Sequence, residues 1–150
     1  MNQEEIENLL HREQVNLAGI SKRASAFFLD ELLLSLLLVV ALWNSFAEAT
    51  TMEELINLSN SFALDYIVLK IIYQAFFVHK YGATLGKIAM RIRVVELRTF
   101  ANPQLPSSIN RSIFRIVSEM FFYLGFLWGM LDPLKRTWHD LSAKTLVVEN

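Results

Sequence analysis

Apolar and polar positions alternate in long blocks along this chain, and three of the blocks are apolar. The first runs from about residue 21 to 43, the second from about 62 to 78, and the third from 107 to 130. A helix rises ~1.5 Å per residue, so the first block can cross a hydrocarbon core about 30 Å thick. The pattern predicts an all-α membrane protein with two transmembrane helices and a third apolar helix, either reentrant or spanning.

The first 16 residues are polar and form a separate unit in this pattern. Ile6, Leu9 and Leu10 fall at helical spacing among acidic residues, which indicates a short amphipathic helix. We therefore divide the chain into an amphipathic N-terminal leader, residues 1–16, and a membrane domain, residues 17–150.

Two runs rich in β-branched residues, at about 92–97 and 145–149, are typical of short strands. They flank the third apolar segment. If they pair into a two-stranded β-ribbon, both lie on one side of the membrane, and the segment between them must enter the bilayer and return. Gly125 supplies a break for such a reentrant helix. Without the pairing, the segment spans and the C-terminus lies outside.

Basic residues are distributed unevenly across the predicted membrane. Lys22 and Arg23 precede the first segment, the loop at 44–61 has no lysine or arginine, and the connection at 79–110 is rich in both. Positive charges near membrane helices mark the cytoplasmic side. The N-terminus, the 79–110 connection and the ribbon are therefore predicted to be cytoplasmic.

Composition supports a membrane location and narrows the chemistry. The chain is 53% hydrophobic with a mean hydropathy of +0.33, and it contains no cysteine, which excludes disulfides and thiolate chemistry. A net charge of −1 gives no reason to expect a nucleic-acid partner. The lipid bilayer is the first predicted partner.

The sequence carries no pattern that predicts catalysis. The histidines are scattered, and the candidate acid–base pair His139-Asp140 has no nucleophile or metal-ligand set beside it. The segment from Gly82 to Lys87 resembles a phosphate loop, but its glycines are one residue too close and no serine or threonine follows the lysine. We predict that the protein is not an enzyme and holds no cofactor or metal.

Charged residues inside the apolar segments are the main functional signal. A charge at mid-membrane costs roughly 2.5–3.5 kcal/mol on insertion scales, and an ordinary membrane anchor has no need of it. Lys70 lies at the middle of the second segment. Its natural partner is Asp30 or Glu31 of the first segment, with Glu119 of the third as the competitor.

The third segment carries a charged stripe of its own. Arg111, Arg115 and Glu119 are spaced i, i+4, i+8 and share one helix face, where Arg115 and Glu119 can pair. Such a face suits a helix packed on protein rather than on lipid.

Several stretches together resemble the RDD family, a group of small, mostly bacterial membrane proteins. The resemblance covers about residues 17–148. The stretches that carry it are residues 23–30, residues 82–87, Arg93 with the two valines after it, Arg111, and residues 136–148.

That family is named for one arginine and two aspartates. The resemblance assigns the arginine to Arg23 and the first aspartate to Asp30, and it assigns the second aspartate to Asp140, with Asp132 as the fallback. Arg23 is then expected to pair with Asp30 or with Asp140. The resemblance also implies a multi-pass protein of the bacterial cytoplasmic (inner) membrane. The family's role is largely unknown, and transport of a ligand or ion has been suggested.

Two functions agree with these features. In the first, the intramembrane charges are helix-packing pairs in a structural or partner-regulating protein. In the second, the chain is a small oligomeric transporter that exchanges cations or protons through Asp30, Glu31 and Lys70. Two spans and a hairpin cannot enclose a pathway alone, so a homo-oligomer or another membrane protein is the expected partner.

Overall fold

The computed structural model describes residues 3–149 and is mostly helical. Residues 1–2 of the predicted leader and residue 150 of the predicted membrane domain lie outside this range. The helices of the described region are, in chain order, α1 (Gln3–Arg12), α2 (Ile20–Ala41), α3 (Trp43–Glu48), α4 (Met52–Ser61), α5 (Ala63–Tyr81), α6 (Leu85–Ala89), α7 (Leu105–Met120), α8 (Leu124–Leu131) and α9 (Trp138–Ala143).

The predicted ribbon is confirmed. Strand β1 (Ile92–Glu96) pairs antiparallel with strand β2 (Thr145–Glu149), and Val94 lies opposite Val147. Because successive side chains of a strand point to opposite faces, the ribbon is apolar on both sides. The face with Val94 packs against α2 and α5, and the face with Val95 packs against α1.

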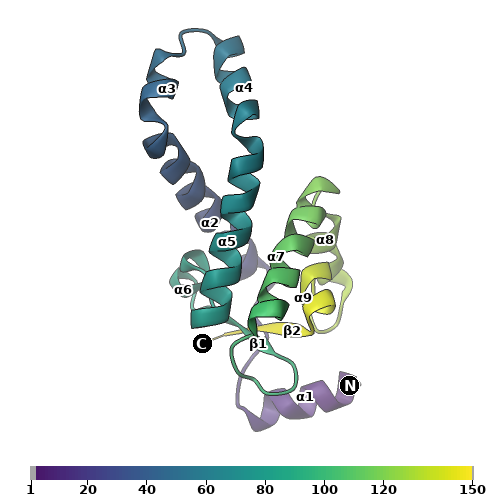
Figure 1. Cartoon of the computed structure of the whole chain (residues 1–150). Coiled ribbons are helices and arrows are strands. Elements are labelled where there is room, and N and C mark those ends of the chain that lie inside the picture. Colours follow the sequence, from purple (N-terminus) through teal and green to yellow (C-terminus); the bar gives the residue numbers. More distant parts are fainter. Residues whose placement is uncertain (1–2, 150) are drawn as a thin grey trace.

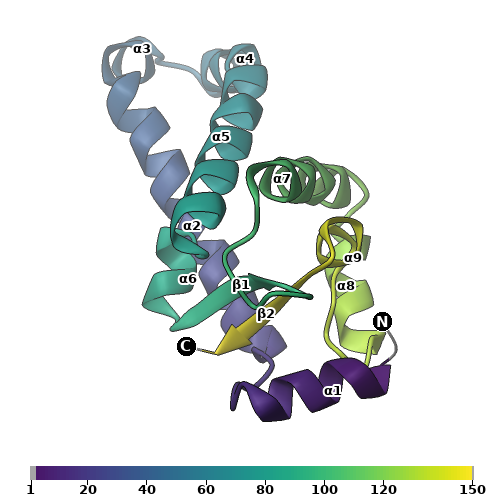
Figure 2. The same ribbon diagram turned by 60° about the horizontal axis from the view of Figure 1, so that its bottom comes forward.

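The leader helix α1 is amphipathic, as predicted. Ile6 and Leu10 are its buried residues, and both lie in the cluster with Val95 and Leu146 of the ribbon. Figure 2 shows α1 passing across the ribbon at the base of the molecule, close to the start of α2. The apolar side of the leader is therefore covered by protein.

One helix of the described region, α2, is long and apolar enough to cross a membrane by itself. Helices α4 and α5, which meet at a bend of 49°, qualify as a second crossing when they are taken together, and the predicted second transmembrane helix over 62–78 stays a prediction. Counting each bent pair as one crossing gives up to three.

The third apolar segment is broken sharply. Helices α7 and α8 meet at 102°, and the break lies at Phe122 and Tyr123, which have φ values of 51° and 61°. The predicted break at Gly125 is therefore a few residues too late. Gly125 instead allows α8 to fold back on α7, because a Cβ there would stand 2.4 Å from Ser118 Oγ.

Figure 1 shows the resulting arrangement. Helices α2 and α5 rise from the ribbon and diverge toward the connection formed by α3 and α4, while α7, α8 and α9 stand to one side. Helix α7 packs against α5 and α9, and α2 packs against α6. These contacts bring the charged faces of α2, α5 and α7 together.

Candidate functional site

Four charged side chains from α2, α5 and α7 form a closed group, which we call the quartet: Glu31, Lys70, Arg115 and Glu119. Lys70 Nζ lies 2.9 Å from Glu31 Oε1 and 2.5 Å from Glu119 Oε2. Arg115 completes the group, with Nη2 3.2 Å from Glu31 Oε1 and Nε 3.3 Å from Glu119 Oε1. Each carboxylate therefore contacts both cations, and the formal charge of the quartet is zero.

The predicted carboxylate partner of Lys70 is found, but it is not Asp30. Lys70 pairs with Glu31 and with the competitor Glu119 at once. Asp30 and Glu31 are neighbours on one helix, so their side chains point about 100° apart and cannot both face α5 at the same place. The intrahelical pair between Arg115 and Glu119 is confirmed.

Asp30 binds a different part of the molecule. Its fully buried carboxylate accepts hydrogen bonds from Tyr73 Oη at 2.7 Å, Thr84 Oγ1 at 2.6 Å and the Gly86 backbone N at 2.8 Å. A carboxylate with three donors is satisfied without a salt bridge. Asp30 thus links α2 to α5 and to the start of α6.

Gly86 makes that link possible. A Cβ at this position would stand 2.2 Å from the backbone O of Ala26 and 2.9 Å from the Asp30 carboxylate. Only glycine lets α6 approach α2 this closely. The segment from Gly82 to Lys87 is therefore a helix-packing and hydrogen-bonding element.

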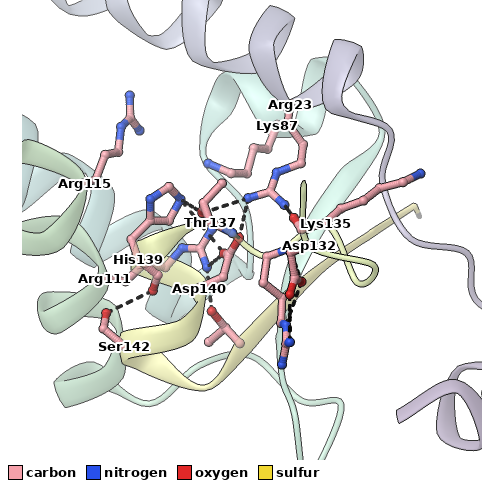
Figure 3. A network of polar contacts seen from close by, with 12 residues as sticks. Arg23, Lys87, Arg111, Arg115, Asp132, Lys135, Thr137, His139, Asp140 and Ser142 are labelled. Carbon is pink, nitrogen blue, oxygen red and sulfur yellow. Dashed lines mark hydrogen bonds and ion pairs between the residues drawn. The ribbon is translucent and has the colours of Figure 1, made fainter. Parts of the chain in front are cut away.

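Asp140 is the centre of a second buried group, shown in Figure 3. Arg23 and Arg111 each donate to one of its carboxylate oxygens, and Thr137 Oγ1 donates to it at 2.7 Å. Arg111 also donates to Thr145 Oγ1 at 2.6 Å. The group joins α2 and α7 to α9 and β2. Of the two partners expected for Arg23, it pairs with Asp140.

The charge state of this second group follows from its surroundings. Burial alone would raise the pKa of Asp140, but the guanidinium groups of Arg111 and Arg23 outweigh burial and hold the pKa well below its usual value. Burial lowers the pKa of His139, so this imidazole is neutral near pH 7. Asp140 is therefore a permanent anion between two permanent cations.

The fallback residue Asp132 lies apart from Arg23. It accepts hydrogen bonds from the Arg136 side chain at 2.9 Å, and these bonds lower the pKa of Asp132. The pair lies in the turn between α8 and α9, where both side chains are partly exposed. The geometry therefore agrees with Asp140, and not Asp132, as the partner of the family arginine.

Lys87 was named in the sequence analysis only as the end of the segment that begins at Gly82. In the structure its side chain is buried. Its Nζ contacts Thr84 Oγ1 at 3.4 Å, and the ion pairs found among the described residues do not include it. Burial lowers the pKa of Lys87, the attraction of Asp30 opposes this, and the positive charges of Arg115, Arg111 and Arg23 add to the lowering. The resulting pKa of Lys87 is about 7. Its position after Gly86 was the only sequence signal.

Within residues 3–149, no group of three or more histidine, aspartate or glutamate side chains is arranged to hold a metal ion. The buried groups around Asp30 and Asp140 and the quartet are held by ion pairs and hydrogen bonds. The charged stripe on α7, read from the sequence, contributes to both buried groups: Arg111 to the group around Asp140, and Arg115 with Glu119 to the quartet.

These features define a small helical membrane protein whose helices are joined through buried ion pairs. The RDD family model matches residues 17–144, and the chain belongs to the RDD family. The resemblance carried by Arg23, Asp30 and Asp140 is thus confirmed at the level of the family. Neither a curated protein nor a solved structure matches the chain.

Proposed function

We propose that this protein is an integral protein of the bacterial cytoplasmic membrane with a structural or partner-regulating role, in which the buried charges are helix-packing pairs. The observation that carries the proposal is the quartet. Two acids and two bases contact one another in a closed ring across α2, α5 and α7. A ring that neutralises itself needs no transported ion.

Energetics support this reading. Removing one member of a buried ion pair typically costs about 3–5 kcal/mol, because the remaining charge is left without compensation. Apolar side chains could fill the same space without that risk, so the pairs select one arrangement of helices over others. Tyr66 adds to this specificity, since its Oη donates to Glu31 at 3.2 Å.

The proposed topology has the N-terminus in the cytoplasm. Helix α2 crosses outward, α4 and α5 return, and the sharply bent pair α7 and α8 enters the bilayer from the cytoplasmic side and leaves on the same side. The distribution of lysine and arginine supports this orientation. The pairing of β1 with β2 supports the reentrant path, because the two strands flank the bent pair.

A groove of about 580 Å³ between α2 and α5 supports the need for a partner. Leu38 and Val39 of α2 line it, as do Phe62, Ile67 and the quartet member Lys70. An apolar groove beside membrane-crossing helices accepts either lipid tails or another helix. We propose that it receives a helix from a second copy of the chain or from another membrane protein.

Site-specific crosslinking in native membranes tests this role. A photoreactive phenylalanine analogue placed at Val39, inside the groove, is expected to form a defined protein adduct. The matched control places the same analogue at Leu36, which lies on the same helix but is exposed outside the groove. If both positions label only lipid, the assembly role is wrong.

Transport is the second candidate, because Lys70 and Glu119 line the groove. The structure alters this hypothesis, since Asp30 is not in the quartet and an ion-exchanging set would be Glu31, Lys70 and Glu119. Proteoliposomes that hold the native chain are expected to show no sodium or proton flux above empty vesicles. Flux that disappears in a folded Glu119→Gln variant would favour transport over the structural role.

A further inference from the structure

A small cavity lies where six helices meet, and basic side chains surround it. Its volume is about 20 Å³, enough for about one water molecule or one monatomic ion. Phe27 and Phe126 form an apolar part of the wall, with ring centroids 5.3 Å apart. The four cations that line it come from α2, α6 and α7 and are Arg23, Lys87, Arg111 and Arg115.

The cavity wall also contains buried polar atoms that lack partners. Gln74 Nε2 and His139 Nδ1 make no hydrogen bond with any residue in the described range, although these residues are only 5% and 4% exposed. An amide N–H left unpaired in the interior is costly, and it marks a place where a ligand atom can be accepted. Thr137 Oγ1 donates to Asp140, so it accepts from His139 Nε2 at 2.9 Å, and the Nδ1 of the neutral ring carries no proton. Of these two atoms, Gln74 Nε2 is therefore the donor that an anion can accept from.

The charges around the cavity do not balance. Asp140 is held by Arg23 and Arg111, and Glu31 and Glu119 are shared by Lys70 and Arg115. Asp30, the remaining carboxylate of the region, accepts its hydrogen bonds from Tyr73, Thr84 and Gly86. The quartet and the group around Asp140 contain four basic side chains, and Lys87 makes five. The region has four carboxylates, so the basic side chains exceed them by one. Among the described residues, Lys87 is the basic side chain of this region that forms no ion pair, so the excess charge is present when Lys87 is protonated.

We propose that this cavity is a binding site for one chloride-sized halide ion, held by Lys87, Gln74 and the surrounding arginines. One monovalent anion balances the excess charge, and its size matches the volume, whereas a tetrahedral oxyanion is larger than the space. Figure 3 shows the Lys87 side chain extending toward the His139 ring beside the Arg23–Asp140 pair. The bound ion would join α2, α5, α6, α7 and α9, independently of the proposed assembly role.

Chloride binding to the full chain in lipid nanodiscs tests the proposal. The protein is first dialysed into sodium gluconate, and radiolabelled chloride then replaces gluconate at constant ionic strength. Saturable binding of one chloride per chain is expected, together with a chloride-dependent rise in the unfolding midpoint. Native protein that binds no chloride and shows no shift in the midpoint would overturn the proposal.

Two substitutions locate the bound ion. Lys87→Met is expected to weaken chloride binding at least tenfold. Gln74→Glu places a carboxylate in the cavity, so it is expected to abolish chloride binding and to raise the midpoint in gluconate toward that of chloride-saturated native protein.

An exposed lysine, Lys80, provides the charge control, and Lys80→Gln is expected to bind chloride as the native chain does. If Lys87→Met does not fold, Gln74→Glu still decides. Native-like chloride affinity in a folded Gln74→Glu variant would place the ion elsewhere and contradict the site.

Discussion

Asp140→Asn is expected to lower the free energy of unfolding by about 3–5 kcal/mol, and the amount of folded protein in the membrane should fall accordingly. The substitution keeps the size of the side chain but removes the carboxylate that, among the described residues, pairs with both Arg23 and Arg111. Two guanidinium groups then remain buried without a counterion. Unfolding in mild detergent, followed by circular dichroism, measures the loss.

Asp132→Asn is the matched control for this prediction. Asp132 also pairs with an arginine, Arg136, but that pair is local and partly exposed. Such pairs contribute about 1 kcal/mol or less. Equal losses of stability in the two variants would mean that Asp140 has no special place in the fold.

Gly86→Ala is expected to destabilise the protein by about 3 kcal/mol, the upper part of the range for overpacking. On helix propensity alone the same change would stabilise a helix by about 1 kcal/mol. The contact reverses that sign, because the new Cβ would stand 2.2 Å from the Ala26 backbone O, and a backbone atom cannot move aside. The hydrogen bond from the Gly86 backbone N to Asp30 is expected to be lost as well.

Gly19→Ala is the control, because a Cβ at Gly19 meets nothing closer than Ser21 Oγ at 3.8 Å. Its stability is expected to stay within about 0.5 kcal/mol of the native value. The same unfolding measurement applies to both variants. A native-like Gly86→Ala protein would show that α6 does not depend on close approach to α2.

Long-period patterns in the sequence were enough to predict much of the fold. The apolar blocks indicated α2, α5 and the α7–α8 pair, and the β-branched runs indicated both strands of the ribbon and their pairing. The i, i+4 spacing on α7 also indicated that Arg115 and Glu119 pair. These features are patterns of residue type and spacing along the chain, so a single sequence is sufficient to detect them.

The partners of individual side chains could not be predicted from these patterns, because they depend on how the helices are placed relative to one another. Asp30 and Glu31 are adjacent, and only the placement of α6 decides that Glu31 meets Lys70 while Asp30 meets Gly86. The helix break at Phe122 and Tyr123 has no glycine or proline to mark it. The unpaired Lys87 likewise emerges only when helices from five separate parts of the sequence are assembled around it.

A double-mutant cycle on Lys70 and Glu119 tests whether the quartet holds the helices together. The native chain, Lys70→Met, Glu119→Gln and the double variant are compared by their free energies of unfolding in the same detergent. The double variant keeps the pair between Glu31 and Arg115 and restores neutrality. Each single substitution is predicted to cost at least about 2 kcal/mol, and the double variant to recover more than half of the summed loss through coupling. Single variants within about 0.5 kcal/mol of the native chain, or strictly additive losses, would mean that the quartet does not hold the helices together.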